Sequence, residues 1–172
     1  MTIHTDHPFL DPDEDPVRRL RGRLGGAVTL WTSGGADPGN RRAGLTVSSV
    51  MVSAGEPGRL LALVDPDGDL RDVLESTGLG VVHLLRWEHR DLAEVFAGQM
   101  PAPGGQFTTG TWEQTDHGPR LVTASTWVRV QVESFETVGW SDLVVARVED
   151  AVIGEDDSPL EHRRGRYRRP TD

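Results

Sequence analysis

The chain has 172 residues, no cysteine, five tryptophans and a formal net charge of −9. This length suits one folded domain with its own core, and the lack of cysteine excludes disulfides, thiolate metal sites, iron–sulfur clusters and cysteine nucleophiles. All 18 basic residues are arginine, which excludes a Schiff-base or Walker lysine, and the negative charge argues against nucleic acid as a partner.

The beginning of the chain is acidic and rich in proline, unlike a signal peptide. No segment reaches the roughly 18 apolar residues that a transmembrane helix needs, so we expect no membrane partner. A cytoplasmic location is expected, and the absence of cysteine suits it. Residues 1–14 are expected to form a flexible acidic lead, and residues 15–172 a single domain.

The first elements in chain order are a helix and three strands. A short helix is predicted over residues 15–24, because Pro16 suits a first turn and three apolar residues share one face: Val17, Leu20 and Leu24. Strands are predicted over residues 27–33, 44–54 and 59–65, separated by turn-rich segments.

A second group of elements follows the turn PDGD. Asp69 is predicted to cap a helix that runs through residues 70–77, and a buried strand is predicted over residues 79–85. Residues 88–98 predict an amphipathic helix, because apolar side chains recur there at helical spacing: Leu92, Val95 and Phe96.

From residue 110 onward the pattern is β. Strands are predicted over residues 111–116, 119–139 and 141–154, and a basic, aromatic tail follows. Seven or so short strands with two or three helices indicate a mainly β fold, a β-barrel with flanking helices. A doubly wound parallel sheet is disfavoured because this part of the chain lacks alternation of strands and helices.

The predicted strand GLTVSSVMVSA (44–54) carries an unusual number of hydroxyl groups. Strand alternation puts Thr46 and Ser48 on one face and Ser49 on the other, within a frame of valines. Such hydroxyls either face a ligand or bond to neighbouring backbone. The strand by itself leaves both interpretations open.

Several known motifs are absent or incomplete. GLGVVH (78–83) lacks the third glycine of a dinucleotide fingerprint, and DPDGDL (65–70) lacks the glycine and glutamate positions of a calcium loop. The six histidines show no metal-ligand spacing, and no G-x-S-x-G elbow is present. We therefore predict no metal site and assign no catalytic side chain.

Four segments, taken together, resemble the flavin reductase-like family. GLTVSSVMVSA resembles its G-[FL]-T-x-S-S strand, and RLLALVDPDGDL resembles the strand and phosphate-side turn that follow. VVHLLRWEHRDLAEVFAG resembles V-N-x-L-x-x-x-Q-x-x-L-A-x-x-F-A, and PLEHRRGRYRR resembles P-L-x-[YH]-x-x-G-x-Y. The resemblance covers about residues 20–168 and implies an FMN-binding split barrel of Greek-key type.

The resemblance also implies an activity and partners. It implies an NAD(P)H-dependent flavin reductase, in which hydride passes from nicotinamide to N5 of FMN, with FAD as an alternative flavin. It further implies a homodimer and a flavin-dependent monooxygenase as the partner that receives reduced flavin. Two alternatives stay open: an accessory FMN-binding protein with little reductase activity, and a barrel oxidoreductase that uses a deazaflavin.

The first two segments supply the implied contacts to the flavin ring and phosphate. On this basis the ring lies against Thr46, Val47, Ser48 and Ser49. The phosphate lies by Asp67, Gly68 and Asp69, where the commoner family pattern has a hydroxyl pair, S-x-T. Two carboxylates repel a phosphate unless they turn away, so backbone amides at the helix N-terminus and Arg71 or Arg90 are the expected donors.

The remaining implied cofactor contacts come from later segments. His83 and His89 stand where the family usually has Asn and Gln, and Leu85 and Arg90 belong to the same segment. Trp140 lies where many members carry G-D-H, and Tyr167, with neighbouring arginines, is placed to meet the phosphates of a nicotinamide cofactor. Each of these residues also has a plain structural interpretation, as core, turn or solvated tail.

Overall fold

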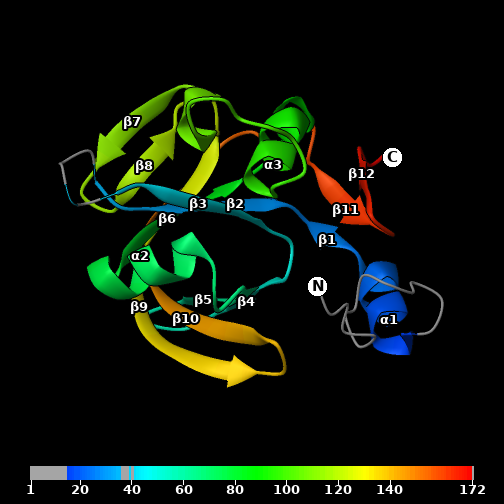
Figure 1. Ribbon diagram of the computed structural model, residues 1–172, viewed down its shortest axis with the longest axis horizontal. Helices are drawn as coiled ribbons and strands as arrows, with labels where there is room; N and C mark the ends of the chain where they lie inside the picture. Colours follow the sequence, from blue (N-terminus) through cyan, green and yellow to red (C-terminus); the bar gives the residue numbers. More distant parts are fainter. Residues whose placement is uncertain (1–14, 36–38, 40, 172) are drawn as a thin grey trace, which may run out of the picture.

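The computed structural model describes residues 15–35, 39 and 41–171, so the predicted acidic lead lies outside the described residues. The central sheet contains seven antiparallel strands. In chain order these strands are β2 (Thr29–Ser33), β3 (Ala43–Val47), β4 (Val50–Ser53), β5 (Arg59–Val64), β6 (Leu79–Leu84), β9 (Thr126–Val138) and β10 (Ser141–Val152). Across the sheet the order is β3-β2-β6-β9-β10-β5-β4, and the sheet curls into a half-barrel (Figure 1). The predicted mainly β barrel with flanking helices is confirmed.

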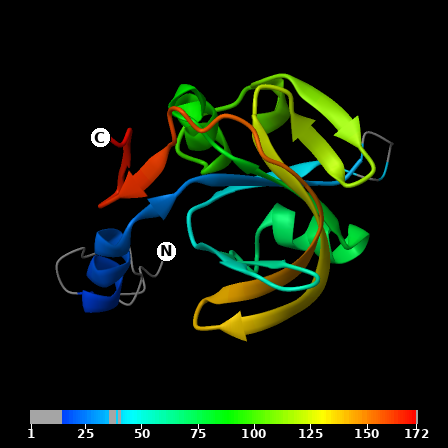
Figure 2. The same ribbon diagram turned by 180° about the vertical axis from the view of Figure 1, so that it is seen from behind.

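The curl of the sheet follows from one short connection. β3 and β4 are the opposite edges of the sheet, yet only Ser48 and Ser49 separate them in the sequence. A link of this length spans about 10 Å at most, so the two edges must approach each other at the serines (Figure 2). The single strand predicted over residues 44–54 is therefore wrong at its centre, where the chain leaves one edge and enters the other.

The first helix, α1 (Pro16–Leu24), confirms the prediction for residues 15–24. Asp15 caps it, because its Oδ1 accepts hydrogen bonds from the N–H groups of Val17 at 2.9 Å and Arg18 at 3.2 Å. The apolar face is not buried: Val17, Leu20 and Leu24 are 71%, 59% and 75% exposed. Among residues 15–171, as far as the structure describes them, this apolar stripe is left facing water, and exposed apolar surfaces of this kind mark interaction sites.

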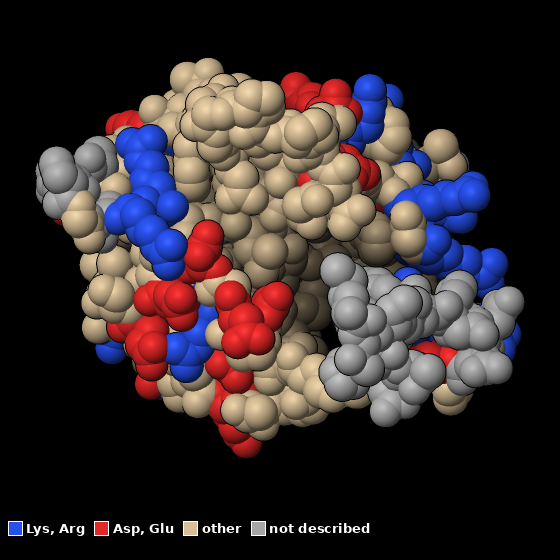
Figure 3. Space-filling model, viewed as in Figure 1, with Lys and Arg blue, Asp and Glu red and all other residues tan. Residues whose placement is uncertain are grey.

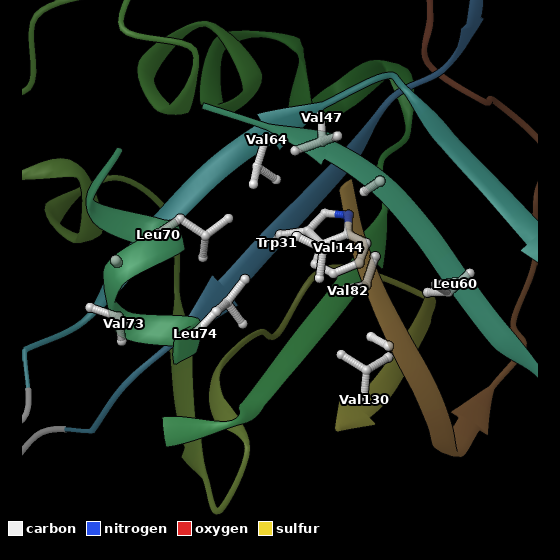
Figure 4. Close-up of a cluster of buried hydrophobic side chains, with 13 residues drawn as sticks. Trp31, Val47, Leu60, Val64, Leu70, Val73, Leu74, Val82, Val130 and Val144 are labelled. Carbon is white, nitrogen blue, oxygen red and sulfur yellow. The ribbon is translucent and has the colours of Figure 1, made fainter. Parts of the chain in front are cut away.

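The second helix, α2 (Asp69–Thr77), packs into the barrel as predicted. It buries Leu70, Val73 and Leu74 against a core that contains Trp31 and Val144 (Figure 4). The helix begins one residue earlier than predicted. Its N-cap is Gly68, and the turn gives it no side-chain cap, so the prediction that Asp69 caps the helix is wrong.

A second layer covers the other face of β2 and β6. It comprises the 3₁₀ turn η1 (Trp87–His89), α3 (Arg90–Phe96), η2 (Gln106–Thr108), β7 (Trp112–Thr115) and β8 (Gly118–Leu121). The predicted helix over residues 88–98 is thus a 3₁₀ turn followed by a shorter α-helix. The predicted strand over residues 119–139 is two strands, β8 and β9, which belong to different sheets.

The C-terminal tail forms a small hairpin beside α1. β11 (Glu161–Arg163) pairs with both β12 (Arg166–Arg168) and β1 (Gly26–Ala27). The N–H of Arg164 donates to the carbonyl of Gly22 in α1 at 2.9 Å. Among the described residues, no helix has the length and apolar character needed to cross a membrane.

Candidate functional site

A groove with a volume of about 210 Å³ opens beside the edge strand β3. Gly44 and Leu45 of β3 form one side, the turn before α2 and its first residues (Gly68–Arg71) form another, and the end of α3 (Phe96–Gly98) forms the third. Three segments that lie far apart in the sequence therefore meet at one place. They are also three of the four segments that resemble flavin reductases.

Gly44 permits the close contact between β3 and α3. A Cβ atom at this position would lie 2.6 Å from a ring carbon of Phe96. The Phe96 ring packs edge-on against Phe107 and Trp112, with ring centroids 5.2 and 5.6 Å away. Phe96, predicted as an apolar position of the helix, is thus both buried and part of the groove wall.

The hydroxyl groups of the β3–β4 junction have different surroundings. Thr46 Oγ1 donates to the carbonyl of Ala93 in α3 at 2.8 Å, and Ser49 Oγ donates to the carbonyl of Leu63 at 3.1 Å. Val47 is buried in the same core as Trp31 and Val144. Ser48 is exposed, and its hydroxyl makes no hydrogen bond to any described residue. Ser48 is therefore the junction hydroxyl that is available to a ligand.

The turn predicted to meet a phosphate lies on the groove. Gly68 and Asp69 line it, whereas Asp67 lies outside the lining. Asp65 organises the turn: its Oδ1 accepts from the N–H of Asp67 at 2.9 Å, and its carbonyl accepts from the N–H of Gly68 at 3.2 Å. The first amides of α2 remain without a side-chain cap.

Arg71 lines the groove but is held by carboxylates. Its Nε donates to Asp142 at 2.9 Å, and a second guanidinium nitrogen pairs with Glu75. The guanidinium also lies 4.5 Å from the centre of the Phe135 ring. Hydrogen bonding to Asp142 raises the pKa of Arg71. The sequence gives no signal for the role of Asp142, because it lies 71 residues from Arg71 along the chain.

His83 lies in the core rather than on the groove. It is 0% exposed, its Nδ1 is 2.9 Å from the carbonyl of Leu30, and its Nε2 accepts from the N–H of Leu121 at 2.9 Å. Burial lowers its pKa from 6.5 to about 4, so the ring is neutral. Both ring nitrogens are already bonded, which leaves none for direct contact with a cofactor. Leu85 is likewise fully buried, in a hydrophobic cluster that also contains Phe96.

His89 and Arg90 lie at the start of α3. His89 Nδ1 accepts from the N–H of Arg86 at 3.0 Å, and its Nε2 is 3.0 Å from Thr123 Oγ1. Burial lowers the pKa of His89. Arg90 is exposed and lies 5.0 Å from the centre of the Trp87 ring. The histidine therefore holds the start of the helix, and the arginine faces solvent.

The last two predicted contacts lie on different hairpins. Trp140 is 77% exposed in the turn between β9 and β10, two residues before Asp142. Tyr167 is half-buried in β12, where its ring packs 5.5 Å from His162. Burial raises the pKa of Tyr167 to about 12. Figure 1 shows β12 at the end of the molecule opposite α2, so the structure does not bring Tyr167 to the groove of the same chain.

Comparison with known proteins gives a consistent result. A model of the flavin reductase like domain matches residues 21–171. The chain is 25% identical over 148 residues to the reductase component of 4-hydroxyphenylacetate 3-monooxygenase from Pseudomonas aeruginosa, and the match covers 85% of each chain.

Solved structures share the fold. An NADH:FAD oxidoreductase from Streptomyces globisporus superposes with a TM-score of 0.80 at 23% identity, over 95% of this chain and 96% of that one. The styrene monooxygenase flavin reductase from Pseudomonas putida S12 superposes with a TM-score of 0.78 at 19% identity, over 91% and 98%. A further structure of the Streptomyces enzyme is in complex with NAD and FAD fragments. With a family match over most of its length and the same curled sheet, the chain belongs to the flavin reductase-like family of oxidoreductases, as its four segments predict.

Proposed function

We propose that the protein transfers hydride from NAD(P)H to FMN, with FAD as the alternative flavin, and that the groove beside β3 holds the flavin. This proposal rests on the groove, because the three segments around it are among those that resemble flavin reductases. A flavin, when bound, supplies the ring that accepts hydride. The protein then has only to bind and orient the two cofactors, so the reaction requires no acid–base pair from its side chains.

The groove has groups suited to a flavin. Leu45 and Phe96 give it an apolar wall, and Gly44 lets the Phe96 ring pack closely against β3. Beyond the residues that line the groove, at the β3–β4 junction, the exposed hydroxyl of Ser48 and the adjacent backbone are available for the polar edge of the ring. The uncapped amides of Asp69 and Leu70 face the same region. The task of these residues is to bind and orient the flavin.

His83 and His89 serve the site as positioning residues. His83 joins β6 to β2 and β8 through its two hydrogen bonds, and His89 fixes the start of α3. α3 in turn carries Phe96 and accepts the hydrogen bond from Thr46. We propose that they shape the groove wall without touching the cofactor.

The assembly is proposed to be a homodimer that hands reduced flavin to a monooxygenase. The chain exposes large apolar residues on the edge strand β4 and at the β9–β10 turn, among them Met51, Val52 and Trp140, and such surfaces mark interfaces. The Pseudomonas relatives are reductases of two monooxygenases by name. In a dimer, Trp140 and Tyr167 can complete the nicotinamide site from the partner chain.

Flavin titration tests the assignment of the β3–β4 junction. We expect the pair Ser48→Ala and Ser49→Ala to weaken FMN binding by about tenfold, the loss of roughly one hydrogen bond to the ligand. Ser53→Ala, at the end of β4, is the matched control and should bind FMN as the unaltered chain does. Unchanged affinity in the double variant would mean that the flavin lies elsewhere.

The flavin that co-purifies separates the two alternatives from this proposal. Mass analysis that finds FMN or FAD, together with NADH oxidation that depends on added flavin, supports the reductase. Bound FMN without NADH oxidation supports an accessory flavin-binding protein. A deazaflavin in place of FMN supports the third interpretation.

A further inference from the structure

The end of the groove where the resemblance implies a flavin phosphate is strongly acidic. Five exposed carboxylates surround the turn and the first two turns of α2: Asp65, Asp67, Asp69, Asp72 and Glu75. In Figure 3, acidic side chains gather over this part of the molecule, beside a hollow in its face. Asp65 and Asp69 line the groove itself. A phosphate placed here would meet like charge.

The arginines at this end are already paired with carboxylates. Arg41 lies 3.2 Å from Asp69 and 3.7 Å from Asp72. Arg71 is held by Asp142 and Glu75. Recruiting either guanidinium to a phosphate would require breaking these pairs, so neither offers an uncommitted positive charge.

The next arginine along the chain, Arg42, hydrogen-bonds to a neutral side chain. Arg42, two residues before Gly44, donates from Nε to Gln114 at 3.0 Å, and its guanidinium lies 5.8 Å from the centre of the Phe107 ring. Among the described residues Arg42 therefore has no carboxylate partner. Arg42 is the alternative group that could bind the flavin phosphate, so the experiment has to test it.

The backbone amides are only partly available. The N–H groups of Asp67 and Gly68 are bonded to Asp65. The positive end of the α2 dipole is compensated by Asp69 and Asp72, which lie in its first turn. The family pattern offers two hydroxyl donors where this chain has Asp67 and Asp69. The amides of Asp69 and Leu70 have no side-chain cap, but the carboxylates that stand in place of the hydroxyl pair repel a phosphate that approaches them.

We propose that this acidic turn prevents recognition of the flavin phosphate, so that the protein binds and reduces riboflavin at least as well as FMN. The ring and the ribityl chain then supply the affinity. A phosphate monoester carries nearly two negative charges at neutral pH, whereas riboflavin carries none. The proposal rests on the flavin reductase function proposed above, and Asp69 is its main specificity-determining residue.

Binding of two flavins to the full chain tests the proposal. Dissociation constants for riboflavin and FMN are measured by flavin fluorescence at about 20 mM and about 300 mM NaCl, which spans strong and weak screening. At low salt we expect riboflavin to bind at least as tightly as FMN. FMN binding should tighten as salt screens the carboxylates, while riboflavin binding stays constant.

One charge-removing variant isolates the turn. Asp69→Asn removes a carboxylate from the groove and leaves Arg41 with Asp72 as its remaining carboxylate partner, so FMN binding should tighten by about threefold to tenfold at low salt while riboflavin binding is unchanged. Asp156→Asn, an exposed carboxylate in the loop after β10, is the matched control and should change neither constant. Arg42→Gln should likewise leave the FMN-to-riboflavin ratio unchanged.

The opposite pattern would overturn the proposal. If FMN binds about tenfold more tightly than riboflavin at low salt, and Asp69→Asn leaves the affinity for FMN unchanged, then another group holds the phosphate. Loss of that preference in Arg42→Gln would identify the group. In that case both flavins are still reduced and the proposed function stands, whereas a chain that neither binds nor reduces either flavin contradicts the function itself.

Discussion

The ring of His83 is fully buried, and both of its nitrogens contact backbone groups of neighbouring strands. It stands where the family usually has Asn, so a direct cofactor contact was a reasonable prediction. In the fold, its ring lies between Leu30 and Leu121 and bonds to the backbone of both. The sequence could not decide between these roles, because Leu121 is 38 residues away.

The buried state of His83 predicts a specific pH dependence of stability. Its pKa is about 4 in the folded chain and 6.5 for an ordinary histidine, so the unfolded chain takes up the proton first as the pH falls. The contribution of His83 is therefore complete above pH 6.5 and declines between 6.5 and 4, by up to roughly 3 kcal/mol.

Urea denaturation across this pH window measures the effect. His83→Gln keeps a polar side chain but cannot take up a proton, so its free energy of unfolding should fall less steeply with decreasing pH than that of the unaltered chain. His117→Gln, at an exposed ion pair with Glu149, serves as a comparison outside the core. Equal slopes for His83→Gln and the unaltered chain would contradict the assignment of a neutral, buried ring.

At the scale of elements, the helices could be predicted because the residues that specify them lie close together in the sequence. The helix at α1 was predicted from Pro16, and the buried face of α2 from the spacing of Leu70, Val73 and Leu74. The break at Ser48–Ser49 was not predictable, because the residues on both sides favour strand and only the pairing of β3 with β2 and of β4 with β5 separates them. The same reason explains the break between β8 and β9.

The contact between β3 and α3 gives a prediction at this scale. Gly44→Ala would force the Phe96 ring aside, so we expect a loss of about 1–3 kcal/mol in the free energy of unfolding together with weaker flavin binding. Gly58→Ala is the control, because its Cβ would meet no atom closer than 3.6 Å. Denaturation and flavin titration of both variants test the contact. A Gly44→Ala chain with unaltered stability would mean that Phe96 is not fixed against β3.

At the scale of the whole molecule, charge and apolar surface divide the chain into distinct regions. Carboxylates gather around α2, whereas α1 and the β11–β12 hairpin carry a concentration of arginines. Apolar residues are exposed on α1, on β4 and at the β9–β10 turn. Composition predicts the overall charge, and the order of predicted strands and helices predicts the barrel class, but this distribution arises only when the sheet curls and places distant segments side by side.

The exposed apolar surface predicts a homodimer. Light scattering during size-exclusion chromatography should give twice the mass of one chain, because exposed apolar surfaces on the described part of the chain are typical of interfaces between subunits. Val52→Asp, on the exposed edge strand, should shift the mass toward that of one chain. A monomer that still binds FMN tightly would contradict a flavin site completed by two subunits.

The most direct test of the central claim is an anaerobic reaction of the full chain with FMN and NADH or NADPH. If the groove beside β3 serves flavin reduction, the visible absorbance of FMN disappears in proportion to the nicotinamide added, at a rate that rises with the amount of protein. FMN that is bound yet bleaches no faster than free FMN with either nicotinamide would contradict the account.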